Sequence, residues 1–135
     1  MARASARDLS GVVQPGRGRG TALMADDAVL ERLEQLAGFR VAPGTLNVRL
    51  PGPLERGADW RYVHAVEISP DWEERSGQAG YFFVPVTIAG HRPGLAFQAD
   101  EPGYPPDQIE LFSDVHLRSA LGLGDGDPIS VAMQS

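Results

Sequence analysis

The stretch that decides the fold class is Pro-Gly-Thr-Leu-Asn-Val-Arg-Leu-Pro-Gly-Pro, residues 43–53. Its apolar residues Leu46, Val48 and Leu50 alternate with polar ones, which is the period of a strand buried on one face. A Pro-Gly pair precedes this strand, and Pro51 ends it because proline cannot donate a hydrogen bond to a sheet. A short strand bounded on both sides by turn residues predicts a mainly β protein.

Short apolar runs between Gly and Pro recur along the whole chain. Gly (16) and Pro (11) together make about a fifth of the 135 residues, which is well above ordinary usage. Further strands are expected at residues 11–14, 62–68, 81–88, 95–98, 109–112 and 129–133, and residues 21–24 are a candidate continuation of the first. Pro85 predicts that the run 81–88 lies at a sheet edge or contains a bulge. Residues 51–67 hold only one weak strand signal.

Two segments have helical rather than strand periodicity. The first begins after a capping carboxylate, Asp26 or Asp27, and ends at Gly38. Its apolar residues fall on one face, namely Val29, Leu30, Leu33, Leu36 and Ala37. The second is shorter, with Val115, Leu117 and Leu121 apolar, Ser113 or Asp114 as the cap and Gly122 as its end. The sum predicts a closed or nearly closed barrel of short strands with two short inserted helices, rather than a βαβ array. We expect a single domain over residues 11–135, preceded by a flexible N-terminal extension, residues 1–10.

Composition excludes several classes of function. The chain has no Cys and no Lys, which rules out thiolate metal sites, cysteine nucleophiles, Schiff-base catalysis and a Walker-type phosphate lysine. Its net charge of −6 disfavours binding to nucleic acid or to an anionic membrane. No apolar run approaches the length that spans a bilayer, and the N-terminus lacks the apolar region of a secretory signal. A cytoplasmic protein is therefore expected.

The stretch Gly16-Arg17-Gly18-Arg19-Gly20 has two interpretations. Alternate glycines allow successive backbone N–H groups to approach an anion, and the two arginines add positive charge, so the stretch is a candidate polyphosphate cradle. The same residues are also typical of a flexible loop. The stretch lacks both the Walker Lys-Ser/Thr pair and the strand–helix context of a dinucleotide fold.

Thr45 and Asn47 point to one face of their expected strand, opposite Leu46 and Val48. A hydroxyl and an amide oxygen are hard ligands that suit Mg²⁺, provided that water and substrate phosphates complete the coordination. The alternative is a polar strand face after a turn. Glu110, between two apolar residues of a short strand, either points into a pocket or faces solvent. Arg118 on the second helix is placed to reach an anion or an acidic side chain.

Other chemistry is not indicated. The three histidines, His64, His91 and His116, lack the spacing of a zinc site. No nucleophile elbow and no pair of catalytic carboxylates stands out.

Taken together, several motifs resemble the archaeal-type CTP-dependent riboflavin kinases. The resemblance covers about residues 11–133, although residues 52–94 add little to it. The motifs are the glycine-rich stretch 16–20, the helix that ends Ala37-Gly38-Phe39, the strand 43–50, the segment from Tyr104 to Leu111, the triplet 116–118 and the turn 123–127. The resemblance implies a six-stranded cradle-loop (RIFT-type) barrel. It also implies transfer of the γ-phosphate of CTP to the 5′-hydroxyl of riboflavin, which yields FMN and CDP.

The resemblance also implies roles for individual residues. Thr45 and Asn47 are the implied Mg²⁺ ligands, and Glu110 and Gly103 fall at the flavin. Our hypothesis is that Mg²⁺ bridges the β- and γ-phosphates while Glu110 orients the ribityl hydroxyl or accepts its proton. The implied nucleotide contacts are Gly16, Arg17, Gly18, Arg19, Gly20, Thr21, Val115, His116, Leu117 and Arg118.

The chain departs from the family pattern in several places. Gly103 stands where the family has a hydroxyl side chain that contacts the FMN phosphate, so that contact is lost or comes from the backbone. The segment between Tyr104 and Glu110 is one residue shorter, Asp114 replaces a proline, and the glycine-rich stretch carries arginines where an apolar and an acidic residue are expected.

These departures leave two alternatives open: a non-catalytic flavin- or nucleotide-binding module, and a cradle-loop barrel of unrelated use. The residues before Gly11 are too few for a winged helix, so a fusion with such a DNA-binding domain is not expected. The preference for CTP rests on the resemblance alone.

Overall fold

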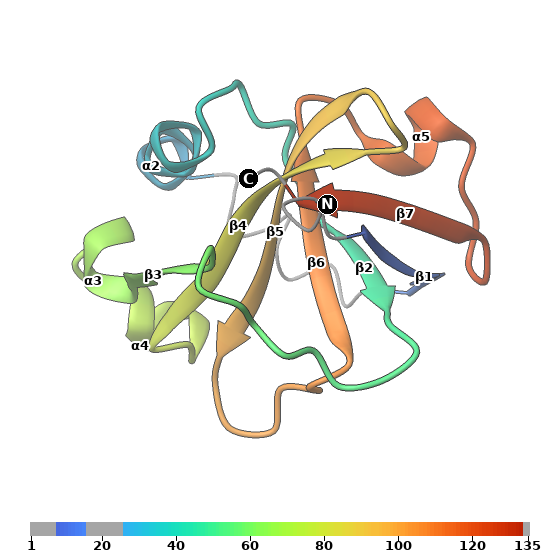
Figure 1. The fold of residues 1–135 in the computed structure, drawn as a ribbon. Coiled ribbons are helices and arrows are strands. Elements are labelled where there is room, and N and C mark those ends of the chain that lie inside the picture. Colours follow the sequence, from blue (N-terminus) through green and yellow to red (C-terminus); the bar gives the residue numbers. More distant parts are fainter. Residues whose placement is uncertain (1–7, 16–25, 134–135) are drawn as a thin grey trace.

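The chain folds into a closed antiparallel barrel with one extra strand attached to its wall. The computed structural model describes residues 8–15 and 26–133. The strands are β1 (Asp8–Gln14), β2 (Leu46–Arg49), β3 (Arg61–His64), β4 (Gly80–Ile88), β5 (Arg92–Asp100), β6 (Gln108–Ser113) and β7 (Pro128–Met133). They pair in the order β3-β4-β5-β6-β2-β1-β7, and a further pairing of β4 with β7 closes six of them into a ring (Figure 1). The predicted mainly β, six-stranded barrel is confirmed.

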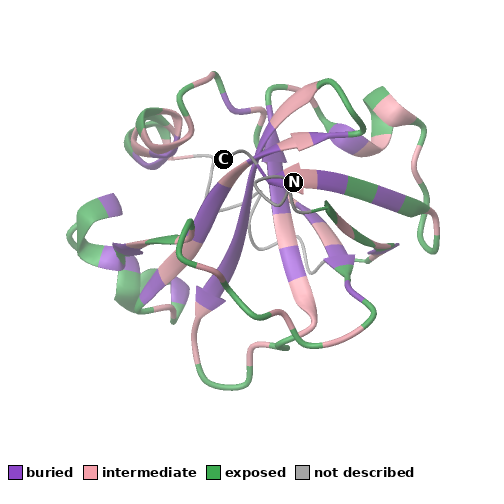
Figure 2. Ribbon diagram, in the orientation of Figure 1, coloured by how far each residue is buried: buried purple, intermediate pink, exposed green. Residues whose placement is uncertain are grey.

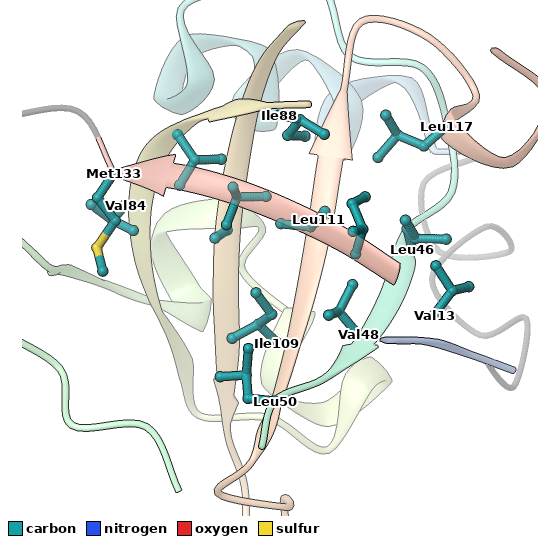
Figure 3. Close-up of a cluster of buried hydrophobic side chains, with 14 residues drawn as sticks. Val13, Leu46, Val48, Leu50, Val84, Ile88, Ile109, Leu111, Leu117 and Met133 are labelled. Atoms are coloured by element: carbon teal, nitrogen blue, oxygen red, sulfur yellow. The ribbon is translucent and has the colours of Figure 1, made fainter. Parts of the chain in front are cut away.

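The interior of the barrel is filled by alternate residues of all six strands. Val86 and Ile88 of β4 are completely buried, and Leu111 of β6 and Val48 of β2 are nearly so. Figure 3 shows side chains of this cluster lying between the strands, among them Val48, Ile88 and Leu111, and Leu117 packs with them. Because successive strand residues point to opposite faces, every second residue of β2 and β6 lies on the outside of the barrel.

A second apolar cluster covers part of that outer surface. Four helices are present in the described part of the chain: α2 (Asp27–Ala37), α3 (Ala65–Ile68), α4 (Trp72–Ser76) and α5 (Leu117–Leu121). Figure 1 shows α2, α3 and α4 on one side of the barrel and α5 on the other. The second cluster joins α2, α3 and α4 to the outward residues Phe83, Leu95, Phe97 and Phe112. The buried faces and exposed outer faces of these elements are visible in Figure 2.

Helix α2 has the ends that its sequence predicts. The Asp26 carboxylate accepts hydrogen bonds from the backbone N–H groups of Ala28 (2.9 Å) and Val29 (3.3 Å). Gly38 ends the helix at a φ of 82°, in the left-handed region that glycine enters without strain. Arg75 of α4 pairs with Asp26 at 3.1 Å, which ties the two helices together. None of the helices in the described ranges is both long and apolar enough to cross a membrane.

The strand predicted for residues 62–68 is only half correct, because the chain turns into α3 after His64. Ala65 and Ile68 are buried, whereas Val66 between them is 66% exposed, so burial follows a helical rather than an alternating pattern. The Glu67 side chain fixes the turn by accepting a hydrogen bond from the His64 backbone N–H at 2.8 Å. The sequence predicts two short helices, which correspond to α2 and α5. The described residues also form α3 and α4, so the predicted number of helices is wrong.

Pro85 lies in the middle of β4, at a place where one side of the strand has no partner. On that side, β4 pairs with β3 over Gly80 to Phe83 and with β7 over Val86 to Ile88. Pro85 falls in the gap, so its missing N–H costs no hydrogen bond to either strand. The expected edge position therefore exists locally, within a strand that is otherwise paired on both sides.

Three further boundaries differ from expectation. β1 begins at Asp8 rather than Gly11, and β5 extends over Arg92–Asp100. The residue that precedes helix α5 is His116, and the expected cap, Ser113 or Asp114, is wrong. Ser113 is instead the last residue of β6, and the Asp114 carboxylate pairs with Arg92 at 3.3 Å. The candidate strand at residues 21–24 lies outside the described residues.

Candidate functional site

Three polar side chains form a row across neighbouring strands on the outside of the barrel. Gln14 of β1 pairs with Asn47 of β2, and Asn47 pairs with Glu110 of β6. The flanking residues of β2 and β6 belong to the interior cluster, so Asn47 and Glu110 point outward. The next residue in the row, Phe97 of β5, belongs to the second apolar cluster. The row therefore joins a polar patch to an aromatic one.

Oxygen atoms converge at the centre of this row. The Thr45 hydroxyl donates to Glu110 Oε1 at 3.3 Å. Asn47 Oδ1 is buried and accepts no hydrogen bond from the described residues. An unpaired buried acceptor is costly, and such groups in native structures often mark a site that a ligand or ion completes. The two side chains expected to lie on one strand face therefore do so, beside a carboxylate.

A tyrosine that the sequence did not single out as a site residue holds the other carboxylate oxygen. The Tyr104 hydroxyl donates to Glu110 Oε2 at 2.7 Å. Gln108 Nε2 donates to the Tyr104 hydroxyl at 3.3 Å, and Gln14 Nε2 donates to Gln108 Oε1 at 2.9 Å. Sequence patterns gave no signal for these contacts, because they depend on the register of β1, β2 and β6 and on the path of the β5–β6 connection.

The Tyr104 hydroxyl is held in its neutral form. Burial raises the pKa of Tyr104 far above its ordinary value, and the neighbouring Glu110 carboxylate raises it further. Tyr104 is therefore a hydrogen-bond donor at every pH at which the protein would work, and it is unsuited to act as a base.

Of the residues expected at the nucleotide, Arg118 contacts the end of β1. Arg118 Nη2 donates to the backbone oxygen of Gln14 at 3.2 Å and pairs with Asp125 at 2.6 Å. Residues 124–127 are held against the same strand, since Val13 N–H donates to Asp127 O and Gly126 N–H donates to Val13 O. The guanidinium of Arg118 thus lies next to the residue from which the chain continues toward Gly16.

The neighbours of Arg118 are placed less favourably for side-chain contacts with a ligand. Leu117 is 4% exposed and belongs to the barrel interior, and Val115 packs against the same cluster. His116 is exposed, with its Nδ1 2.9 Å from the Ser119 hydroxyl. A contact from Leu117 would therefore have to come from its backbone, whereas Val115 is only partly buried.

Gly103 lies in the connection between β5 and β6, directly before Tyr104. Its φ of 82° is in the left-handed region, where a side chain is strained. A hydroxyl residue at this position would therefore need a different backbone path. The predicted phosphate cradle, Gly16, Arg17, Gly18, Arg19, Gly20 and Thr21, lies outside the described residues.

The donor set suits a hard cation better than a soft one. In residues 8–15 and 26–133, no group of three or more His, Asp or Glu side chains could hold a metal ion. The candidate ligands are instead the hydroxyl of Thr45 and the amide oxygen of Asn47, whose Oδ1 accepts no hydrogen bond from the described residues. Mg²⁺ takes oxygen ligands and usually keeps water and substrate phosphates among them, so the residues fit that ion if phosphates complete its coordination.

Comparison with known proteins identifies the family. The family model CTP-dep_RFKase, described as a domain of unknown function (DUF120), matches residues 13–133. The chain belongs to the CTP-dependent riboflavin kinase family. The predicted resemblance is therefore confirmed.

Several relatives in this family are named riboflavin kinase. The protein of Methanocella arvoryzae is 33% identical over 126 residues, which cover 93% of this chain and 56% of the relative. That of Methanococcoides burtonii is 32% identical over 130 residues, covering 94% and 57%. That of Aeropyrum pernix is 31% identical over 122 residues, covering 90% and 91%. The chain thus spans a little over half of the first two relatives and nearly all of the third.

Proposed function

We propose that this chain is a riboflavin kinase that transfers the γ-phosphate of CTP to the 5′-hydroxyl of riboflavin, yielding FMN and CDP. Membership of the family and the names of its relatives support the reaction class. The use of CTP follows the family name, because no described side chain reads a cytosine by its geometry.

The observation that carries the proposal is the convergence of Thr45, Asn47 and Glu110 on the outer face of the barrel. Phosphoryl transfer requires accurate positioning and neutralisation of charge more than covalent chemistry. Glu110 supplies a carboxylate that can accept a proton, and Asn47 supplies a buried oxygen with no partner in the described chain. Both sit on strands of a packed barrel, which limits their movement.

In the proposed reaction, Glu110 accepts a hydrogen bond from the 5′-hydroxyl of riboflavin. As the hydroxyl oxygen bonds to the γ-phosphorus, the bond from that phosphorus to the β–γ bridging oxygen breaks and CDP leaves. The hydroxyl proton passes to the Glu110 carboxylate. Arg118 of α5, whose guanidinium donates to the Gln14 backbone oxygen at the end of β1 and pairs with Asp125, would balance negative charge on the nucleotide.

Thr45 and Asn47 would hold Mg²⁺ together with the phosphates of the nucleotide. When bound, the ion would neutralise phosphate charge, which lets a chain without lysine handle a triphosphate. We further propose that the glycine-rich stretch from Gly16 to Thr21 binds the phosphates through its backbone N–H groups.

The direct test is FMN formation by the purified protein. The protein is incubated with riboflavin, Mg²⁺ and CTP, ATP, GTP or UTP in turn, and the flavin products are separated by chromatography. We expect FMN with CTP and little with the other three. Equal rates with ATP would contradict the assigned donor, and flavin binding without FMN from any donor would favour the non-catalytic module.

The variant Glu110→Gln tests the role of the carboxylate, because it keeps the shape of the side chain and removes the base. We expect kcat to fall by roughly 100- to 10,000-fold, the usual contribution of general base catalysis. The KM for CTP should change little. Full turnover in Glu110→Gln would show that another group takes the proton.

A further inference from the structure

The carboxylate of Glu110 is held at both of its oxygens by two different parts of the chain. Thr45, directly before β2, donates to Oε1, and Tyr104, in the β5–β6 connection, donates to Oε2 at 2.7 Å. Two donors on opposite oxygens fix the rotation of the carboxylate plane, which a single donor leaves free.

The direction of the Tyr104 hydrogen bond is fixed by a third side chain. The Gln108 amide Nε2 can only donate, so at 3.3 Å it occupies a lone pair of the Tyr104 hydroxyl and leaves the phenol proton for Glu110. Gln108 is in turn oriented by Gln14, whose Nε2 donates to Gln108 Oε1 at 2.9 Å. The donors therefore run one way, from β1 through β6 to the carboxylate.

The backbone around Tyr104 is also constrained. Tyr104 N–H donates to the Glu101 oxygen in a turn, and Gln108 N–H donates to the Pro105 oxygen. Pro105 and Pro106 fix two φ angles between these turns. The Tyr104 side chain is thus held on a short, restricted connection rather than on a free loop.

We propose that Tyr104 is a positioning residue for Glu110. Its hydroxyl, oriented by Gln108 and Gln14, holds the carboxylate in the rotamer that accepts the ribityl hydroxyl proton. This inference rests on the proposed kinase function and deepens it, since it adds a residue that acts on the reaction only through Glu110.

A second tyrosine provides a matched control. Tyr62 of β3 donates to Asp100 at 2.6 Å, a bond of the same chemistry and nearly the same length. Two strands, β4 and β5, separate β3 from β6 in the sheet. Tyr62→Phe and Tyr104→Phe therefore remove the same atom from equivalent bonds, and only the second bond involves Glu110.

The experiment measures FMN formation under saturating and single-turnover conditions for the wild type, Tyr104→Phe, Tyr62→Phe, Glu110→Gln and the double variant Tyr104→Phe/Glu110→Gln. We expect Tyr104→Phe to lower kcat by about 10- to 100-fold, the range for one hydrogen bond to a charged group. The KM for riboflavin should change by less than about threefold, since the position of the carboxylate matters most when it takes the proton in the transition state. Tyr62→Phe should retain wild-type kcat.

The double variant separates positioning from a general structural role. If Tyr104 acts through Glu110, Tyr104→Phe lowers the rate much less in the Glu110→Gln background than in the wild type. A crystal structure of Tyr104→Phe should show the Glu110 carboxylate rotated away from its wild-type position. This second readout decides the matter where the Glu110→Gln rate is too slow to measure.

The outcomes distinguish failure of this inference from failure of the proposed function. A wild-type protein that forms no FMN with any donor overturns the proposed function and this inference with it. An active wild type whose Tyr104→Phe variant keeps kcat within twofold overturns the inference alone. Equal losses of kcat in both Glu110 backgrounds, or an unmoved Glu110 carboxylate, also overturn it.

Discussion

The two faces of β2 and β6 differ completely in what they contribute. On the inner face, Val48 and Leu111 are at most 2% exposed and pack into the barrel core. On the outer face, Asn47 and Glu110 are partly buried residues, and the buried Oδ1 of Asn47 accepts no hydrogen bond from the described residues. One face of these short strands therefore packs into the barrel core, and the other face carries the polar side chains of the candidate site.

We infer from this difference that stability and activity are separable residue by residue along one strand. A change on the inner face should act on the free energy of unfolding and spare the chemistry of the folded molecules. A change on the outer face should do the reverse. The predictions below test this separation, beginning with the largest expected effect.

Removing the proposed Mg²⁺ ligands tests the outer face most severely. The double variant Thr45→Ala/Asn47→Ala should abolish Mg²⁺-dependent FMN formation, because both side-chain oxygens are lost. Product formation is measured across a range of Mg²⁺ concentrations. Ser130→Ala, an exposed hydroxyl on β7, serves as the control and should remain active. Unchanged activity in the double variant would refute the metal assignment.

Leu111→Ala tests the inner face, one residue from Glu110. Leu111 is 1% exposed, so the variant should lose about 2–5 kcal/mol of stability through the cavity that it leaves. Denaturant unfolding measures this loss. The kcat per folded molecule should stay near that of the wild type at low temperature. A stable but inactive Leu111→Ala would break the separation of the two faces.

Asn47→Leu sharpens the comparison from the opposite side. A buried oxygen that accepts no hydrogen bond, as Asn47 Oδ1 does among the described residues, costs free energy in the folded state, so an apolar side chain of similar size should leave the Tm unchanged or raise it. FMN formation should be lost. A large fall in Tm would mean that Asn47 stabilises the barrel by itself.

The tyrosines extend the comparison to alkaline pH. Burial raises the pKa of Tyr81 to about 12, and the hydrogen bond to Asp100 raises that of Tyr62 to about 12. Because these values exceed the ordinary 10.0, the stability gained from the neutral phenols is complete below pH 10 and is lost as pH rises through about 12. Tyrosinate absorbance should therefore appear near pH 10 in denaturant and only well above it in the native protein. Ionisation near pH 10 in the native protein would contradict this.

The smallest effect is expected at the exposed cap of α2. Hydrogen bonding to the Val29 N–H, followed by pairing with Arg75, lowers the pKa of Asp26 below its ordinary 3.8. The contribution of the cap is therefore present above pH 3.8 and is lost as pH falls through the lowered pKa. Asp26→Ala should lower the Tm at neutral pH, and this difference should shrink in acid. Asp27→Ala, the adjacent carboxylate, is the control and should have less effect on the Tm.

Local signals explain why some elements could be predicted and others could not. Helix α2 has an apolar face, a capping carboxylate and a terminal glycine within its own sequence, and it forms as expected. Helix α3 has one local signal, the Glu67 side chain that accepts a hydrogen bond from the His64 backbone N–H, but it is only four residues long and lacks a terminal glycine. The apolar residues Val63 and Ala65 alternate as in a strand, and the helix is favoured by this cap together with the packing of Ala65 and Ile68 in the second cluster.

The candidate site divides in the same way. Strand alternation correctly placed Thr45 and Asn47 on one face, and the family resemblance pointed to Glu110. The hydrogen bonds around Glu110 could not be predicted from the sequence. Tyr104 reaches Glu110 because of the path of the β5–β6 connection. Gln14 donates to Gln108, which is 94 residues away in the sequence. Sequence periodicity reports which face a residue takes and carries no information on such distant partners.

Strand β4 pairs with β5 along its whole length, but on its other side the gap at Pro85 separates two halves that have different partners. The first half, Gly80 to Phe83, bonds to β3, and the second, Val86 to Ile88, closes the barrel against β7. Detachment of β3 breaks no bond of the closing seam, so residues 61–79 can open as a local unfolding unit while the barrel remains intact. In amide hydrogen exchange, the protons that β3 shares with β4 should therefore exchange together, and faster than those of the barrel strands.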